Sequence, residues 1–279
     1  MDSLRKYKLI VALLFCALVV ESCALIRLSK KMRLPRQKEQ SVVKKYVPVR
    51  VIPGEKPKPK NKGKIAIVLD DWGYNLNNIS AAQQIKYPLT IAILPQLPYS
   101  KEISQVMHNS GFEVIIHLPM EPYEKIRLEK HTLMTGMNGA AIGAILDNAL
   151  TDVLYAKGVS NHMGSKATTD LQTMNALFPE LKKRKLYFLD SYVSSNSVCS
   201  QPASKYNVPF AQRDIFLDNE SNSAYIKQQL YKLKSKARMY GEAIGIGHDR
   251  KNTLAVLKEV MPELENEGFS FVFLSALVE

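Results

Sequence analysis

Carboxylate and imidazole side chains stand at the ends of several apolar runs in this 279-residue chain. Such groups can bind a metal ion or move a proton. Seven residues occupy these positions: Asp70, Asp71, His117, His162, Asp190, Asp218 and His248. Because three of the five histidines are among them, we interpret the arrangement as a site rather than as chance placement.

These residue types suit one kind of chemistry. Imidazole together with carboxylate is a ligand set for zinc or another first-row divalent metal. Such a metal lowers the pKa of bound water and polarises a carbonyl oxygen. A carboxylate that is not bound to the metal can take the proton of the water, and a histidine on the opposite side can protonate the leaving group. This division of roles describes metal-assisted hydrolysis of an amide or an ester.

The elements that must position these groups start at residues 64–74. Residues 65–69 are five apolar residues in a row, long enough for one buried parallel strand that ends at Asp70 and Asp71. Further apolar runs predict strands at 90–94, 112–116, 159–162, 186–189, 209–217, 243–246 and 269–274. Apolar periodicity and terminal signals predict helices at 75–84, 100–109, 139–156, 171–184 with a break at Pro179, 222–240 and 253–267.

This alternation of strands and helices predicts an α/β fold with a parallel sheet and right-handed crossovers. In a parallel barrel the carboxyl ends of the strands share one face, so groups far apart in sequence would meet there. No glycine-rich fingerprint follows the first strand, which counts against a dinucleotide-binding fold. Residues 64–279 are fewer than the roughly 250 residues of a full eight-fold barrel, which favours a compact or seven-stranded one.

The first 63 residues differ from the rest in composition. Residues 1–26 combine a basic start with an apolar run at 9–20, which predicts a signal peptide or membrane anchor. Residues 27–63 predict a flexible, proline-containing linker. Because residues 27–64 contain 14 lysines and arginines against 2 acidic residues, they account for the net charge of +12. Of the three cysteines, only Cys199 lies beyond this region, which excludes a disulfide framework.

We therefore expect an exported protein, periplasmic or tethered to the membrane of a bacterial envelope. The basic linker would be attracted to an anionic membrane surface or an acidic envelope polymer. Nucleic-acid binding is not expected, because no DNA- or RNA-binding motif accompanies the basic segment.

Several segments resemble polysaccharide deacetylases. Residues 67–71 (IVLDD) resemble the paired-aspartate first motif, residues 111–117 (GFEVIIH) the strand that delivers a metal histidine, and residues 244–248 (IGIGH) the last motif with its histidine acid. More closely, five segments are similar, in order, to the divergent polysaccharide deacetylase family: 117–122 (HLPMEP), 161–165 (NHMGS), 189–191 (LDS), 213–218 (RDIFLD) and 247–248 (GH).

The resemblance implies a deformed (β/α)7–8 barrel over residues 64–279 and a metal-dependent hydrolase that removes acyl groups from an envelope or extracellular glycan. It implies that Asp70 is the general base, that Asp71 and His117 bind a divalent metal, expected to be zinc, and that Asp190 supports the acid His248.

One metal position departs from the family pattern. Classical deacetylases place a second metal histidine four residues after the first, where this chain has Glu121. We infer that His162 completes the ligand set from the neighbouring strand, with Glu121 as the competing candidate.

Five residues are predicted to bind the substrate: Trp72, Tyr74, Glu121, Asn161 and Arg213. Trp72 and Tyr74 either stack on a sugar ring or cover the mouth of the barrel. Asn161 is expected to hydrogen-bond the groups around the metal, and Arg213 either pairs with a strand-end carboxylate or clamps the substrate. The alternative function is a catalytically silent, glycan-binding or scaffolding envelope protein with the same barrel.

Overall fold

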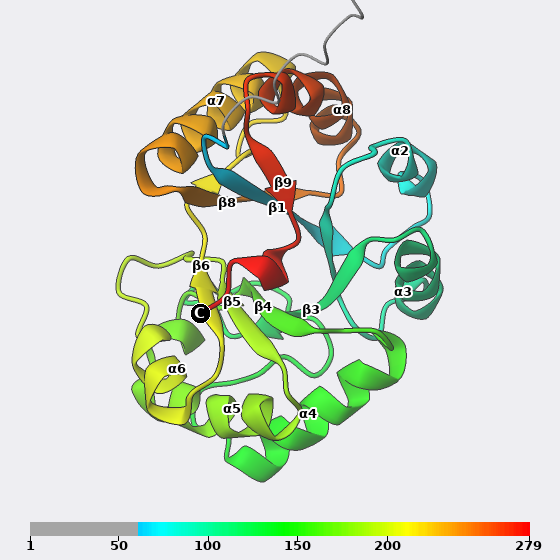
Figure 1. Ribbon diagram of the computed structural model, residues 1–279. Helices are drawn as coiled ribbons and strands as arrows, with labels where there is room; N and C mark the ends of the chain where they lie inside the picture. Colours follow the sequence, from blue (N-terminus) through cyan, green and yellow to red (C-terminus); the bar gives the residue numbers. More distant parts are fainter. Residues whose placement is uncertain (1–60) are drawn as a thin grey trace, which may run out of the picture. The chain divides into compact units, whose positions relative to one another are not determined.

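The structure, a computed structural model, describes residues 61–279 (Figure 1). The predicted signal or anchor segment, 1–26, and nearly all of the predicted linker, 27–63, lie outside the described residues. Among the helices of residues 61–279, none combines the length and the apolar character that a bilayer crossing requires.

A parallel sheet of nine strands forms the centre of the fold. Its hydrogen-bonded order is β6-β5-β4-β3-β2-β1-β8-β7, and β9 pairs with the first residues of β1. The strands are β1 (Lys64–Trp72), β2 (Thr90–Ile93), β3 (Glu113–Met120), β4 (Gly158–Met163), β5 (Tyr187–Asp190), β6 (Phe210–Gln212), β7 (Ile215–Phe216), β8 (Glu242–His248) and β9 (Ser270–Val272).

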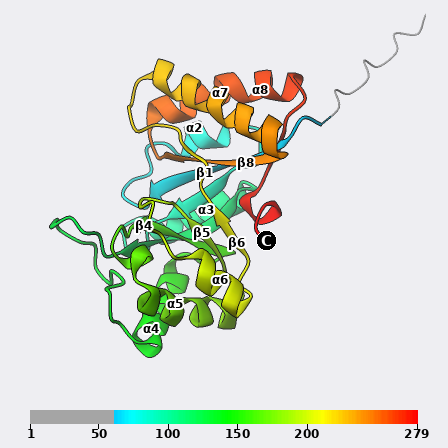
Figure 2. The ribbon, with the colours of Figure 1, turned by 90° about the vertical axis from the view of Figure 1, so that its left-hand side faces the viewer.

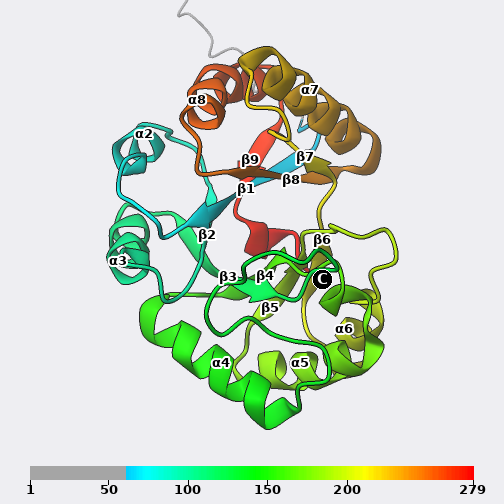
Figure 3. The ribbon, with the colours of Figure 1, turned by 180° about the vertical axis from the view of Figure 1, so that it is seen from behind.

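Helices cover the outside of the curled sheet (Figures 1 and 3). They are α2 (Ile79–Gln83), α3 (Ser100–Asn109), α4 (Gly139–Asp152), α5 (Leu171–Lys183), α6 (Ser200–Tyr206), α7 (Ser223–Tyr240) and α8 (Lys251–Asn266), with short 3-10 turns η1 (Ala167–Thr169) and η2 (Leu274–Ala276). Figure 2 shows α7 and α8 on one side of the sheet and α4 to α6 on the other.

The barrel is open along one seam. β6 and β7 stand at the two ends of the strand order although only Arg213 and Asp214 separate them in sequence. Within residues 61–279 no strand pairing joins them. These two residues are hydrogen-bonded to strands on both sides of the seam: Arg213 N donates to Asp190 O of β5 at 3.0 Å, and Asp214 N donates to Ile244 O of β8 at 2.9 Å. The chain itself, rather than sheet hydrogen bonds, therefore closes the ring.

Two apolar layers result from the alternation along the strands. In β1, Ile65, Ile67 and Leu69 belong to the large cluster that the sheet shares with the helices. Ala66 and Val68 belong to a second, smaller cluster with residues of other strands and η2, which fills the inside of the ring. Asp70 follows on this inner face, at the carboxyl end of the strand.

The predicted α/β class and the curled, barrel-like parallel sheet are confirmed. Several details of the predicted elements are wrong. The strand predicted at 209–217 is two strands, because the crossing of the seam interrupts it. Strand β3 continues past His117 to Met120, where it still pairs with β4. The short helix α6 was not predicted.

The predicted break at Pro179 is also wrong, because α5 runs unbroken from Leu171 to Lys183. A proline removes one helix hydrogen bond. Leu177, Phe178 and Leu181 are fully buried around it, so packing outweighs that loss.

The start of β4 leaves no room for a side chain, which gives a test of the packing. A Cβ at Gly158 would lie 2.2 Å from the ring of Tyr187, and that buried ring is held by its hydroxyl donating to Glu113 Oε1 at 2.9 Å. We expect Gly158→Ala to lower the free energy of unfolding by about 1–3 kcal/mol in a denaturant titration. Gly139→Ala, at the open first turn of α4, is the control and should not destabilise the chain. Equal stability of the two variants would contradict this packing.

Candidate active site

An irregular step in β1 brings two neighbouring carboxylates to one place. The register against β2 shifts between Leu69 and Trp72, and Asp71 has a φ of 66°, in the left-handed region. In a regular strand the side chains of Asp70 and Asp71 would point to opposite faces. Here Asp70 Oδ2 and Asp71 Oδ1 lie 3.6 and 3.3 Å from the same atom, Nε2 of His117. The bulge thus aims both carboxylates at the end of the barrel.

Asp71, His117 and His162 form a possible metal centre. They come from β1, β3 and β4, and one ligand atom of each lies within 4.8 Å of the others. Asp71 Oδ1 is 3.3 Å from His117 Nε2 and 3.0 Å from His162 Nδ1. Although buried, this oxygen has no hydrogen-bond partner among the described residues. Three ligand atoms that converge without bonding one another fit a shared divalent cation, and the two-imidazole, one-carboxylate set suits zinc chemistry.

The ring of His117 is oriented from the neighbouring strand. Ser160 is its register partner in β4, and Ser160 Oγ lies 2.7 Å from His117 Nδ1. This contact engages the nitrogen that faces away from the cluster and leaves Nε2 toward Asp71. Partners of this kind fix the orientation of metal-binding imidazoles.

His248 is oriented by Asp218. Asp218 follows β7 and His248 ends β8, the strand that pairs with β7, and Asp218 Oδ1 lies 2.7 Å from His248 Nδ1. The other oxygen, Oδ2, accepts from His248 N at 2.9 Å and from Thr253 Oγ1 at 2.6 Å. His248 Nε2 faces the cluster, 4.0 Å from Asp71 Oδ2. This geometry suits a proton donor held by a buried carboxylate.

The prediction that Asp190 supports His248 is therefore wrong. The carboxylate of Asp190 accepts from Ser197 Oγ at 2.6 Å and from Tyr192 N at 2.8 Å, and so organises the turn after β5. Asp190 ends β5, whose neighbours are β4 and β6, whereas β8 pairs with β7 and β1. Strand order makes Asp218 the neighbour of His248.

Burial and neighbouring charges shift the pKa values of the site residues in different directions. Burial, followed by the charges of Asp71 and Asp218, raises the pKa of Asp70 well above its usual range. Burial would also raise the pKa of Asp71, but its close approach to His117 and His162 outweighs this and lowers it. Burial lowers the pKa of His117 to about 4. An anionic Asp71 and a neutral His117 are the forms that bind metal.

Two predicted substrate contacts are buried instead. Trp72 is fully buried, so its ring packs in the core and does not meet a sugar. Asn161 is also buried, and its amide binds backbone: Oδ1 accepts from Ser191 N at 2.8 Å and Nδ2 donates to Met163 O at 2.7 Å. Asn161 thus holds the ends of β4 and β5 together, and its predicted contacts to substrate and to metal-binding groups are wrong.

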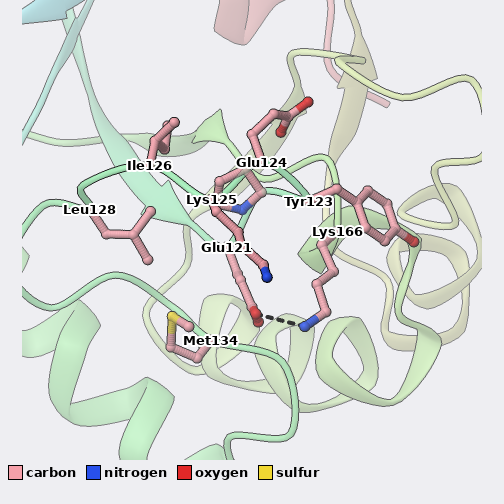
Figure 4. A pocket seen from close by; sticks show the side chains of 9 residues that line it. Glu121, Tyr123, Glu124, Lys125, Ile126, Leu128, Met134 and Lys166 are labelled. Atoms are coloured by element: carbon pink, nitrogen blue, oxygen red, sulfur yellow. Dashed lines mark hydrogen bonds and ion pairs between the residues drawn. The ribbon is translucent and has the colours of Figure 1, made fainter.

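Glu121 belongs to the scaffold beside the site. Its Oε1 accepts from Lys166 Nζ at 2.7 Å (Figure 4). Its Oε2 accepts from Thr135 N at 2.7 Å and from Thr135 Oγ1 at 2.6 Å. It is not part of the possible metal group of Asp71, His117 and His162, so the geometry favours His162 over Glu121 as the third candidate ligand. Glu121 and Lys166 do line a surface pocket of about 560 Å³.

Arg213 forms no close ion pair among the described residues, and its predicted contact with a substrate stays a prediction. Its Nε donates to Ser191 O at 2.7 Å and its Nη2 donates to Tyr192 O at 2.9 Å. The guanidinium lies 3.7 Å from the centre of the Phe216 ring. Its positive charge still acts on the site, because it lowers the pKa of Asp70 against the larger opposing effects.

Tyr74 lies two residues after β1, and its predicted role, stacking on a sugar ring or covering the barrel mouth, stays a prediction. It is 49% exposed, and its hydroxyl donates to Glu129 Oε1 at 3.2 Å. Sequence reasoning missed Glu129, as well as the roles of Ser160 and Thr253. Asp218 carried a signal, since it stands at a strand end, whereas the other three lie at ordinary-looking positions of a loop, a strand and a helix.

A parallel sheet curled into an open barrel, with Asp-His-His and Asp-His groups at its carboxyl edge, defines the class of deacetylase-like (β/α) barrels. The family model for divergent polysaccharide deacetylases matches residues 67–278, and the chain belongs to this family.

Two bacterial proteins are similar to this chain over most of its length. The uncharacterized protein YibQ of Escherichia coli strain K12 is 39% identical over 206 residues, which are 74% of this chain and 65% of YibQ. An uncharacterized protein of Haemophilus influenzae is 36% identical over 74% of each chain. The crystal structure of the uncharacterized protein ATU2773 from Agrobacterium tumefaciens C58 shares the fold, with a TM-score of 0.74, 24% identity and coverage of 78% of this chain and 90% of that one.

The ligand assignment predicts the effect of removing each donor. Asp71→Asn, His117→Ala and His162→Ala should each weaken zinc binding by more than about 100-fold. Loss of a metal ligand lowers the affinity more than loss of a residue that only hydrogen-bonds a ligand. Isothermal titration of the metal-free protein measures this. His131→Asn, an exposed loop change outside the group, is the control and should bind like the wild type. Unchanged affinity in all three variants would rule out this centre.

Glu121 gives a pH prediction that is separate from the metal. Burial would raise its pKa, but Lys166 and Thr135 outweigh this and lower it to about 2. The unfolded chain therefore binds more protons between pH 4.5 and about 2, so the stabilisation is complete above pH 4.5 and is lost as pH falls through this window.

We expect Glu121→Gln to lower the free energy of unfolding by about 1–3 kcal/mol at pH 7, because the amide has no negative charge to pair with Lys166 and keeps only one of the two acceptor oxygens that Lys166 and Thr135 use. Denaturant titrations should show this difference shrink toward pH 2, while zinc binding stays unchanged. A difference that is constant with pH would contradict the charge-based origin.

Proposed function

We propose that this protein is a metal-dependent hydrolase that removes acyl groups from an envelope or extracellular glycan. One observation carries the proposal: a possible metal group, a free carboxylate and an oriented histidine lie together at the carboxyl edge of one deacetylase-like barrel. Membership of the divergent polysaccharide deacetylase family supports an acylated carbohydrate as the substrate class.

Asp71, His117 and His162 are the residues that would hold the metal, which supplies Lewis acidity toward water and the acyl oxygen. Asp70 stands beside them as the proton acceptor. Its Oδ1 is buried without a hydrogen-bond partner among the described residues, so it is available to an incoming water. Its raised pKa makes it a stronger base than an exposed aspartate.

His248 is the matching proton donor for the leaving amine or alcohol. Its Nδ1 is engaged by Asp218, which leaves Nε2 free to donate toward the cluster. Because Asp218 is fully buried and accepts three further hydrogen bonds, it is fixed in place and holds the ring in one orientation.

The envelope location is part of the proposal. The basic and apolar start of the sequence (residues 1–26) would direct export or anchor the chain, and the basic segment that follows would contact anionic surfaces. Recovery of the full chain from the cytoplasm alone, in fractionated cells, would contradict it.

The proton-acceptor role gives the decisive activity test. Asp70→Asn should lower the release of acetate from N-acetylated oligosaccharides by about 100-fold or more while zinc still binds, because the variant loses the base but keeps all three metal donors. The control is Asp147→Asn, at an exposed residue of α4 that pairs with Arg184, and this variant should retain full activity.

Zinc-loaded wild type that binds such glycans but releases no acyl group would instead support the silent glycan-binding alternative. Equal turnover by Asp70→Asn and wild type would reject the proposed mechanism.

A further inference from the structure

The segment between β3 and α4, residues 121–138, leaves the barrel edge and returns to it. Its return point is Leu133, a fully buried residue. Leu133 N donates to Pro119 O at 2.8 Å, and Glu121 N donates to Leu133 O at 2.9 Å. Residues 121–133 therefore form an excursion whose two ends are bonded together, and several of its side chains are seen in Figure 4. We call residues 121–133 the β3–α4 loop.

One side chain of the β3–α4 loop turns back to the candidate metal centre. Glu129 Oε1 lies 3.6 Å from His162 Nε2 and accepts from the Tyr74 hydroxyl at 3.2 Å. Thr132 Oγ1 donates to Glu129 O at 2.7 Å, which fixes the backbone at this point. Both Glu129 Oε2 and His162 Nε2 are buried without a hydrogen-bond partner among the described residues. A carboxylate and an imidazole thus face each other with unused bonding capacity.

The pattern of the other two imidazoles indicates what this contact does. His117 Nδ1 has Ser160 Oγ at 2.7 Å, and His248 Nδ1 has Asp218 Oδ1 at 2.7 Å. Each ring therefore has a polar partner on the nitrogen that points away from the cluster. For His162 the nitrogen toward Asp71 is Nδ1, so the outward nitrogen is Nε2, and Glu129 is the acceptor that faces it.

A neutral imidazole carries one N–H and one lone pair, and a metal takes the lone pair. We propose that Glu129 is a positioning residue of the metal centre, whose carboxylate accepts the Nε2 proton of His162 and so holds the tautomer with its Nδ1 lone pair toward Asp71 and His117. This inference rests on the metal site of the proposed function.

The same geometry separates this role from direct ligation. Asp71 approaches His162 at Nδ1, whereas Glu129 approaches it at Nε2, across the ring. Glu129 therefore lies behind the imidazole relative to the cluster. A carboxylate behind a metal-binding histidine raises the basicity of the ligand and fixes its orientation.

Zinc alone is the probe, and affinity is the first readout. Competition with a chelator should show zinc binding to Glu129→Ala weakened about 10–100-fold relative to wild type. Glu129→Gln should lose less, because its amide oxygen still accepts from Nε2. Glu124→Ala is the matched control on the same loop: its carboxylate accepts from Ser165 Oγ at 3.1 Å, away from the histidines, and affinity should be unchanged.

The second readout reports the tautomer directly. Nitrogen NMR of zinc-loaded protein labelled at histidine should show His162 protonated at Nε2 and bound to zinc through Nδ1. In Glu129→Ala the Nε2 proton should exchange with solvent faster, even where the variant is saturated with zinc. Zinc bound through Nε2, or wild-type affinity in Glu129→Ala, would overturn the inference.

These readouts are independent of turnover. Weak zinc binding by Glu129→Ala with the expected tautomer supports the inference even if no acylated glycan is hydrolysed, in which case only the proposed function fails. Normal zinc affinity of Glu129→Ala in a protein that does hydrolyse such glycans overturns the inference and leaves the function standing.

Discussion

The whole site depends on one irregular step in the backbone of β1. Strand geometry sends successive side chains to opposite faces, so a regular β1 could give the site only one of its two adjacent carboxylates. The left-handed φ of Asp71 and the extra residue opposite β2 turn both toward His117. Left-handed backbone is unfavourable for most residues but is tolerated by aspartate. The bulge thereby yields one carboxylate with a lowered pKa and one with a raised pKa, only one residue apart.

Around this step, lateral neighbours in the sheet supply the outer partners of the imidazoles. Ser160 reaches His117 because β4 lies beside β3 in register, and Asp218 reaches His248 because β7 lies beside β8. Parallel pairing thus does two things at once. It brings the ends of distant strands to one rim, and it sets a second polar side chain next to His117 and next to His248.

The open seam between β6 and β7 explains how this ring is completed with short strands. Arg213 and Asp214 cross it, bonded to β5 on one side and β8 on the other. Arg213 then stacks on Phe216, which in turn lies parallel to the His248 ring with centroids 6.1 Å apart. The crossing therefore forms part of the packing around the His248 ring. It also separates Asp190, before the crossing, from Asp218 after it, so only the latter meets His248.

The sequence by itself determined the class of fold, the buried strands, most helices and the residue types of the site, because apolar periodicity and polar residues at strand ends are local properties of the chain. It named Asp70, Asp71, His117, His162 and His248, which the structure brings together. The sequence could not show whether Asp190 or Asp218 contacts His248, or that Trp72 and Asn161 are buried. It also could not show that Glu121 bonds Lys166 and Thr135, since each of these outcomes depends on which segments are neighbours in space. Only the tertiary structure decided these points, because strand order, the seam and the return of the β3–α4 loop bring together residues whose separation in sequence carries no signal of contact.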